Sequence, residues 1–338
     1  MKKLLILLLC VLITFGGCSS KETALKSDGE AITETKSEEV IDNPFYKMAT
    51  SPKRPVAVMI DNDSEDARPQ IGLEDAYLIY EIIVEGGASR IMALFKDYRV
   101  EKVGPVRSSR HYFLDYALEN DAIYVHAGWS PQAQRDISSL GVNNINGLIG
   151  NDTANYWRDY TYDKSWHNLY TSVAKLSEHA RSNKNYKMKA DFSGPVEFLT
   201  KDTVPDGDVC TDVSFAYSNM YKVGYTYNAD TATYTRSING KPHMSQTEKA
   251  FEAKNIIIYD VANYDLKDGQ NKGRQDIKNI GSGTGWYISM GKAEKISWEK
   301  NSRTGKTKYL KEDGTKLKVN PGITYIQIIP KGNSINIK

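Results

Sequence analysis

The apolar residues of this chain come in short runs, and this pattern constrains the fold more than any other feature. After the first 18 of its 338 residues, runs of about four to eight mostly apolar residues end at turn-forming Gly, Asn or Asp. Buried β-strands have this length, whereas a membrane-spanning helix needs about 20 apolar residues. We therefore expect a strand-rich fold and no membrane-spanning helix after the N-terminal segment.

The one longer apolar run stands at the N-terminus. Lys2 and Lys3 precede the apolar segment 4–15, which is too short to span a bilayer, and Gly16-Gly17-Cys18 follows. A basic start, a short apolar stretch and small residues predict a secretory signal peptide over residues 1–17. The ending on cysteine resembles the lipobox of bacterial lipoproteins, although Phe15 stands where that pattern usually has Leu. The resemblance implies cleavage before Cys18 and a lipid on its thiol; the alternative is a plain signal peptide with a chance cysteine.

The net charge of the chain changes once the signal peptide is removed. The formal net charge of +2 falls to zero, because residues 1–17 hold two lysines and no acid. Residues 21–42 carry seven acids, three lysines and no aromatic residue, so we expect a lipid-anchored, disordered tether over residues 18–53. The folded remainder is only mildly basic, which argues against a nucleic-acid partner.

Two folded regions with different patterns follow the tether. Residues 54–190 mix short apolar runs with helical segments, such as 108–119, and predict a mixed α/β (α+β) domain. Residues 195–338 alternate with period two between turn signals and predict a mainly β domain.

An arginine-containing motif, GPVRSSR (104–110), is the most informative stretch for function. Ser108 or Ser109 is expected to cap the helix that follows, which would put Arg107 and Arg110 at a helix N-terminus. Cations are unfavourable there unless an anion lies between them. The motif therefore predicts a phosphate or carboxylate site, in which the hydroxyls of Ser108 and Ser109 and free backbone amides bind the ligand together with the two arginines. Arg90, which follows a Gly-Gly turn, is a further candidate ligand-binding residue. The alternative is that internal acids pair with both arginines.

An aromatic loop and two histidines supply the remaining candidates. In residues 155–170, Arg158 and Asn168 could bind the hydroxyl groups of a sugar stacked on tryptophan, although core packing would use the same residue types. His126, at a predicted strand end, and His167 are candidate general acid–base residues, and Glu85 could assist one of them. Glu81 and Glu85 lie about 13 Å apart on a strand, too far for a glycosidase pair. Scattered histidines and a lone Cys210 predict no metal site, and no cofactor motif is found.

Longer strings carry a family resemblance. The sequence resembles the YerB-like lipoproteins over nearly all of residues 54–330, in RPVAVMIDN (54–62), YEIIVEGGASR (80–90), GPVRSSR (104–110), VHAGWSP (125–131) and PGITYIQIIP (321–330). The resemblance implies two domains and lipid anchoring on the outer face of a bacterial cytoplasmic membrane, mostly in Gram-positive organisms. It implies no particular activity. Trp166 stands where the family usually has proline, which weakens any argument that needs a rigid turn there.

Three functional hypotheses remain open at this point. The leading one is a tethered envelope protein that binds an anionic or glycan-type ligand through the arginine motif. The second is an enzyme that acts on envelope phosphodiester or glycosidic bonds. The third is a protein-interaction module that uses the tyrosine-rich β domain, because tyrosine is favoured at interfaces.

Overall fold

The computed structural model describes residues 23–25, 31–33, 42–163, 165–270 and 272–338. The predicted signal peptide and Cys18 lie outside the described residues. Residues 43–338 form one compact unit, and in the separate unit of residues 1–42 the strands β1 (Thr23–Leu25) and β2 (Ala31–Thr33) pair antiparallel. The compact unit includes helix α1 (Pro44–Ala49), so it begins within the segment predicted as a tether.

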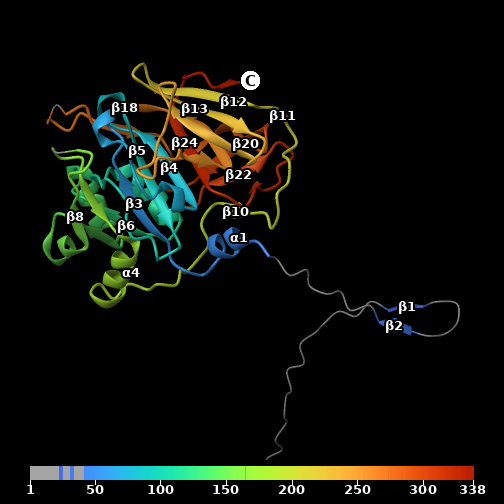
Figure 1. The fold of residues 1–338 in the computed structure, drawn as a ribbon, viewed down its shortest axis with the longest axis horizontal. Helices are drawn as coiled ribbons and strands as arrows, with labels where there is room; N and C mark the ends of the chain where they lie inside the picture. The colour runs from blue at the N-terminus through green and yellow to red at the C-terminus, as the bar shows by residue number, and fades with distance from the viewer. Residues whose placement is uncertain (1–22, 26–30, 34–41, 164, 271) are drawn as a thin grey trace, which may run out of the picture. The chain divides into compact units, whose positions relative to one another are not determined.

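A large mixed sheet runs through both predicted domains (Figure 1). Its eleven strands, in order, are β11 (Asp208–Val209), β21 (Lys292–Lys300), β20 (Gly281–Ser289), β17 (Asn255–Val261), β24 (Thr324–Pro330), β4 (Leu78–Ile83), β5 (Ser89–Phe95), β3 (Val56–Ile60), β6 (Ile123–His126) and β7 (Asn144–Asn146), with β22 (Lys308–Lys311) on β21. Strands β3, β6 and β7 are parallel, as are β17, β24 and β4; the other pairs are antiparallel. The parallel pairing of β24 with β4 joins the two predicted domains in one sheet.

The central strands of this sheet are covered on both faces. Every residue of β3, β4, β5 and β24 is buried. Strands buried on both faces have continuous apolar sequences rather than alternating ones, and the short apolar runs of the sequence are these strands. Some polar residues of these strands are buried as well, among them Glu81 on β4 and Gln327 on β24.

A second, antiparallel sheet belongs to the C-terminal region. Its strands, in order, are β15 (Lys241–Pro242), β14 (Thr233–Ile238), β13 (Tyr221–Asn228), β12 (Asp212–Ser218) and β25 (Asn336–Ile337), with β16 (Glu252–Ala253) on β14. Alternate residues of β12 point inward, and Tyr217 donates hydrogen bonds to the Glu81 carbonyl and to Gln327 Oε1 of the large sheet. Tyr217, Tyr225 and Tyr234 are buried, so these tyrosines form core and not a docking surface. A mixed α/β region followed by a mainly β region confirms the predicted fold class.

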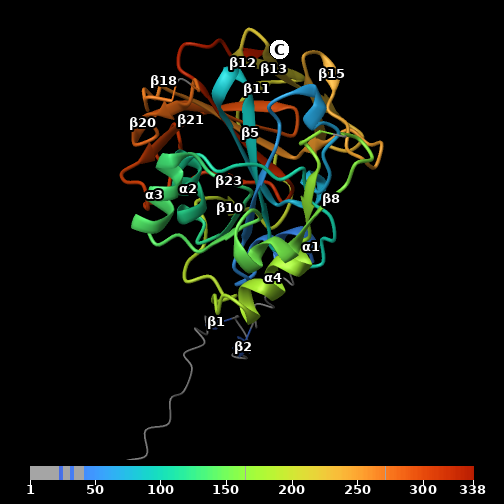
Figure 2. The same cartoon turned by 90° about the vertical axis from the view of Figure 1, so that its left-hand side faces the viewer.

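Three longer helices cover the N-terminal part of the large sheet (Figure 2). They are α2 (His111–Glu119), α3 (Pro131–Ser139) and α4 (Val173–Ser182). Serine side chains cap two of them: Ser130 Oγ accepts from Ala133 N, and Ser172 Oγ accepts from Lys175 N. None of the helices in the described residues has the length and apolar character needed to cross a membrane.

The predicted serine cap of α2 is wrong. Arg110 occupies the N-cap position without a side-chain hydrogen bond, and the helix begins at His111. Ser109 instead lies in an extended segment that bridges to Trp129, and its Oγ accepts from Tyr124 OH at 2.9 Å. Ser109 thus lies one residue before the N-cap, and its hydroxyl bonds Tyr124 instead of a backbone amide of the first helical turn.

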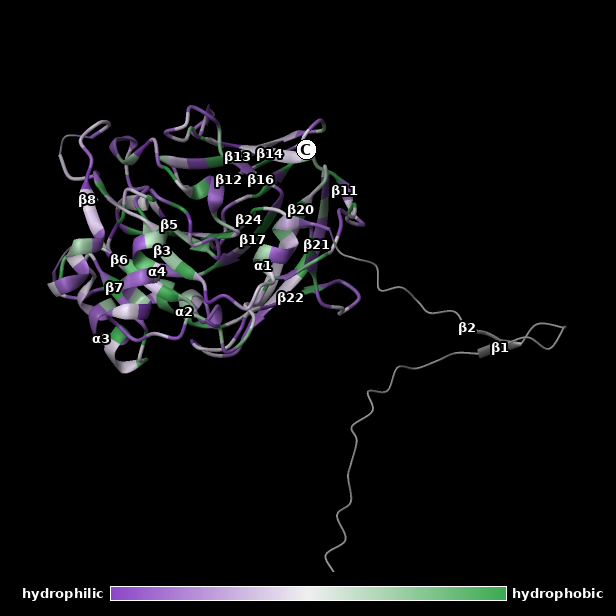
Figure 3. Ribbon diagram, turned by 60° about the horizontal axis from the view of Figure 1, so that its bottom comes forward, coloured by the Kyte–Doolittle hydropathy of each residue, from purple (hydrophilic) through white to green (hydrophobic). Residues whose placement is uncertain are grey.

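Short elements complete the unit. Two-stranded pairs are β8 (Tyr156–Arg158) with β9 (Leu169–Thr171), β10 (Glu197–Phe198) with β23 (Lys318–Val319), and β18 (Asn263–Asp265) with β19 (Gln275–Ile277); 3-10 turns span Glu65–Ala67, Leu73–Asp75, Glu85–Gly87 and Gly150–Asn155. Apolar segments lie mainly in the strands and helices, and polar residues occupy the connecting loops (Figure 3). The loops that follow β3 and precede β9 hold the candidate site.

Candidate functional site

Charged side chains from distant segments meet where β3 ends. We call Asp61, Asp63, Arg90, Arg107 and His167 the arginine–aspartate cluster. The two aspartates follow β3, and Arg90 lies on the neighbouring β5. The segment before α2 runs beside the end of β3, with Arg107 N donating to Met59 O at 2.9 Å. That same segment pairs with the start of β9, through Val106 N and Leu169 O, and so brings His167 into the cluster.

Both predicted ligand-binding arginines of the motif are paired with internal acids. Arg107 contacts Asp61 through Nε (3.2 Å to Oδ2) and Asp63 through Nη2 (3.1 Å to Oδ2). Arg110 contacts Glu85 Oε1 at 2.6 Å and donates to the Ser109 carbonyl at 2.8 Å. The structure therefore has the internal pairing that the sequence left as the alternative, and an anion site in this motif stays a prediction.

Arg90 is the most buried cation of the cluster. Its Nη1 donates to the Ser108 carbonyl at 2.9 Å, and its Nη2 lies 3.5 Å from Asp63 Oδ2. Its Nε is buried without a hydrogen-bond partner among the described residues. Burial and the nearby charge of Arg110 lower the pKa of Arg90 to about 10, which keeps it charged near neutral pH.

An aspartate–histidine pair lies beside the arginines. His167 Nδ1 is 2.8 Å from Asp61 Oδ2, and this hydrogen bond raises the pKa of His167 above its usual value. Burial opposes ionisation of Asp61, but the bond from His167 and the charges of Arg107 and Arg90 prevail and lower its pKa. Burial and the charge of Asp61 raise the pKa of Asp63 instead. Among the described residues, no hydrogen bond engages His167 Nε2.

Trp166 covers the outer side of the cluster. Its ring packs on the Arg107 guanidinium, 4.0 Å from Cζ to the ring centroid, and its side chain is 58% exposed. Asp163 positions the loop, because its Oδ2 accepts from the backbone amides of Trp166 (2.9 Å) and His167 (2.7 Å). Buried Asn168 closes the same loop by donating to the Asp163 carbonyl and accepting from Arg158. Asn168 and Arg158 thus hold the loop that presents Trp166 and His167.

The predicted catalytic role of His126 does not fit its surroundings. The ring is fully buried, with Nδ1 2.8 Å from the Gly128 carbonyl and Nε2 3.3 Å from Asn144 Oδ1. Burial lowers the pKa of His126 to about 4. A neutral ring with both nitrogens engaged has neither a free proton acceptor nor access to a substrate near neutral pH.

Sequence reasoning missed the two aspartates of the cluster. Asp61, Asp63 and His167 could each offer a ligand atom to a metal, all within 4.8 Å of one another, although no metal site was predicted. The guanidinium groups of Arg107 and Arg90 already lie against these carboxylates and supply the positive charge that a metal would. The sequence does contain one feature that could have identified these aspartates. They come directly after a buried strand, a position where ligand sites of α/β folds are common.

Comparison with known proteins shows the family to which the chain belongs. Residues 44–187 match the family model described as "Protein of unknown function (DUF3048) N-terminal domain", and residues 212–326 match that of its C-terminal domain. The chain belongs to the DUF3048 family. It is 34% identical over 289 residues, 84% of each chain, to "Putative lipoprotein YerB" of Bacillus subtilis (strain 168). It is also similar to the crystal structure of the YerB protein from Bacillus subtilis, with a TM-score of 0.73 and 31% identity over 87% of this chain and 99% of that one.

In this DUF3048 chain, a buried polar network connects the two family domains directly behind the cluster. We call Asn62, Gln70, Glu81, Arg236 and His243 the junction network. Glu81 and Arg236, both fully buried, form an ion pair of 2.9 Å across the domains. Asn62 donates to Glu81 and accepts from Gln70 Nε2 at 3.0 Å, while Gln70 Oε1 lies 2.7 Å from His243 Nε2. Because Asn62 stands between Asp61 and Asp63, the C-terminal domain helps to fix the backbone of the cluster.

Proposed function

We propose that this DUF3048 protein is a lipoprotein, anchored through Cys18 on the outer face of the cytoplasmic membrane, that binds an anionic or glycan-type envelope ligand at the arginine–aspartate cluster. The signal segment and its lipobox-like ending support the anchor. The similar protein of Bacillus subtilis is also named a putative lipoprotein. The cluster belongs to the family's N-terminal domain, so the proposal places ligand binding in that domain.

The stacking of Trp166 on Arg107 is the observation that carries the binding proposal. An indole that packs one face on a fixed guanidinium and remains 58% exposed is a platform for a flat or ring-shaped ligand group. Arg107 is itself held by two carboxylates, so the platform loses little side-chain entropy on binding. Aromatic and arginine side chains fixed in this way commonly dominate binding energies.

The arginines and acids at the cluster balance in charge, so protonation of His167 gives the cluster the net positive charge that favours an anion. Arg90, Arg107 and Arg110 face Asp61, Asp63 and Glu85, and His167 with its raised pKa adds positive charge as the pH falls. The Nε2 of His167, which has no hydrogen-bond partner among the described residues, becomes a donor that a phosphate or carboxylate oxygen could use when the ring is protonated.

The proposal is tested by binding of residues 43–338 to purified cell walls, before and after chemical removal of phosphodiester-linked polymers. Trp166→Ala, at an exposed position, should weaken binding about tenfold or more, as loss of a dominant aromatic does. Met220→Ala, an exposed apolar residue on the turn between β12 and β13, is the matched control and should bind as the wild type. Loss of binding on stripped walls would identify the anionic polymer as the ligand, and retention would identify the glycan. Equal binding by Trp166→Ala and the wild type would contradict the proposal.

The Asp61–His167 pair favours a second candidate, hydrolysis of an envelope phosphodiester. In this version His167 acts as general acid–base through Nε2, Asp61 orients its ring, and Arg107 stabilises developing negative charge. The same wall preparations test it by release of soluble phosphate esters. Release should stop in His167→Asn, while wall binding through Trp166 and Arg107 is weakened but not lost. No release by the wild type would leave binding as the function of the cluster.

A further inference from the structure

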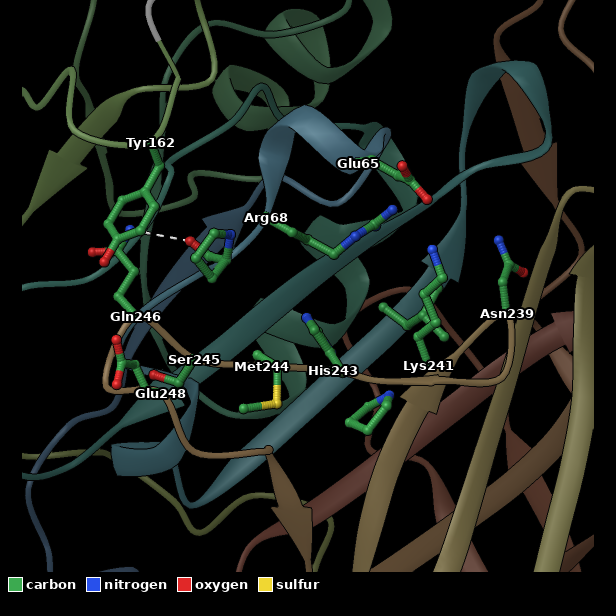
Figure 4. Close-up of a pocket in the computed structure, with 13 residues that line it drawn as sticks. Glu65, Arg68, Tyr162, Asn239, Lys241, His243, Met244, Ser245, Gln246 and Glu248 are labelled. Atoms are coloured by element: carbon green, nitrogen blue, oxygen red, sulfur yellow. Dashed lines mark hydrogen bonds between the residues drawn. The ribbon is translucent and has the colours of Figure 1, made fainter.

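A cavity of about 490 Å³ lies between the two family domains (Figure 4). Residues Glu65, Arg68, Pro69 and Tyr162 line it from the N-terminal domain, and residues between Ile238 and Glu248 line it from the C-terminal domain. Ligand sites have this size and often lie between domains. The lining includes no member of the arginine–aspartate cluster, so this is a separate site.

The walls of the cavity are largely apolar. Pro69, Ile238, Pro242 and Met244 line it together with the ring of Tyr162. Met244 is 39% and Tyr162 48% exposed, so apolar surface faces the opening. A ligand side chain of modest size could cover this surface and gain the free energy of apolar burial.

Charged side chains stand at both ends of the cavity, two cations and one acid at one end and one acid at the other. Figure 4 shows Lys241 and Arg68 toward one side and Glu248 on the other, with Met244 between. Within the described part of the chain, no hydrogen bond or ion pair engages Lys241 Nζ or the Glu248 carboxylate. Arg68 donates one side-chain hydrogen bond, to Asn62 Oδ1 at 3.1 Å, which leaves its other donors for a ligand. Glu65 lies at the Arg68 end, so the four charged side chains of the cavity sum to zero.

His243 adds no charge to this balance. Its Nε2 bonds Gln70 and its Nδ1 accepts from Arg236 Nε at 3.0 Å. Burial and the charge of Arg236 lower the pKa of His243 well below its usual value. A neutral cavity with separated charges disfavours a polyanion and suits a molecule that carries one positive and one negative group.

We propose that this cavity binds a short zwitterionic peptide. Lys241 and Arg68 bind its terminal carboxylate, Glu248 binds its amino group, and Pro242 and Met244 contact an apolar side chain between them. Capture of peptide termini is a recurring mode of recognition, and hydrogen bonds between ionised groups are stronger than neutral ones. The site is independent of the proposed envelope ligand, because the cavity and the arginine–aspartate cluster share no residue.

The probe is the tripeptide Ala-Leu-Ala, titrated calorimetrically into residues 43–338 in its free, N-acetylated and C-amidated forms. We expect the free form to bind, and each cap to weaken binding about tenfold, because each removes one charge-assisted contact. Glu248→Gln should abolish the difference between free and acetylated peptide. Lys241→Gln should reduce the difference between free and amidated peptide, because Arg68 still binds the carboxylate. Both residues are exposed, so neither change should affect folding.

Two controls separate this site from the rest of the molecule. Lys222→Gln, at an exposed position of β13, should bind the three peptides as the wild type does. Trp166→Ala should also leave peptide binding unchanged, so failure at one site is distinguishable from failure at the other. Absence of binding at millimolar peptide, equal binding of capped and free forms, or unchanged preferences in Glu248→Gln and Lys241→Gln would each overturn the proposal.

Discussion

His126 and His167 lie in the same family domain but have opposite electrostatic surroundings. His126 is buried and its ring nitrogens contact neutral groups, whereas the ring of His167 is hydrogen-bonded to the buried carboxylate of Asp61. The two are equivalent in the sequence, since each follows apolar or aromatic residues. Their local partners therefore shift the two pKa values in opposite directions: burial lowers that of His126, and the bond to Asp61 raises that of His167.

The pH dependence of each histidine follows from the direction of its pKa shift. The folded pKa of His167 is raised, so its contribution to stability is complete below the unfolded value of about 6.5 and is lost as the pH rises through the folded pKa. We expect the stability difference between the wild type and His167→Gln to shrink from pH 6 to pH 9 in urea unfolding. For His126, with a folded pKa of about 4, stability is instead lost as the pH falls from about 6.5. An NMR titration midpoint of His167 at or below 6.5 would contradict the assignment.

Strand β24 is the element that makes the two family domains interdependent. It lies between β17 and β4, and the register pairs Thr324 with Leu78 and Ile328 with Ile82. Without β24, the fully buried β4 becomes an edge strand with unpaired backbone groups and apolar side chains on both faces.

We therefore expect residues 43–190 alone to aggregate. Size-exclusion chromatography with light scattering should show large species for this fragment and a discrete species for residues 43–338. Co-expression with residues 195–338 should restore solubility if the missing pairing is the cause. A soluble 43–190 fragment with a native-like near-UV spectrum would show that β4 does not need its partner.

At the scale of the whole molecule, the buried pair of Glu81 and Arg236 connects the domains. Arg236 also donates to Tyr225 OH and His243 Nδ1, so its guanidinium is surrounded by partners on the C-terminal side. A buried ion pair adds little net stability, but removal of one partner leaves an uncompensated buried charge.

Arg236→Met should lower the free energy of unfolding by about 3–5 kcal/mol, and Glu81→Leu/Arg236→Met should recover part of this loss. Lys187→Ala, in the exposed pair of Lys187 with Asp191, is the control and should cost less than about 1 kcal/mol. Urea unfolding of each variant provides the measurement. A loss below 1 kcal/mol for Arg236→Met would show that water or rearrangement compensates Glu81.

Local patterns predicted the elements well, because hydrophobic periodicity and caps act over a few residues. The short apolar runs form buried strands such as Val56–Ile60 and Ser89–Phe95, and the helical segment predicted over residues 108–119 contains α2 (His111–Glu119). The cap of α2 was wrong because Ser109 bonds Tyr124 and bridges to Trp129, partners that no local pattern includes. Asp61 and Asp63 were missed for the same reason, since their arginine and histidine partners are 27 to 106 residues away.

The sequence by itself determined the class of fold, the order of its two regions and the N-terminal segment with its lipobox-like ending. These depend on composition and on spacing along the chain, which are local properties. Only the tertiary structure decided that both domains share one sheet, that Arg107 and Arg110 face internal acids, and that His167 rather than His126 joins the cluster. Those outcomes depend on which charges meet after the chain has folded. Coulombic and hydrogen-bond energies depend on distance and burial in space, and neither is encoded in separation along the sequence.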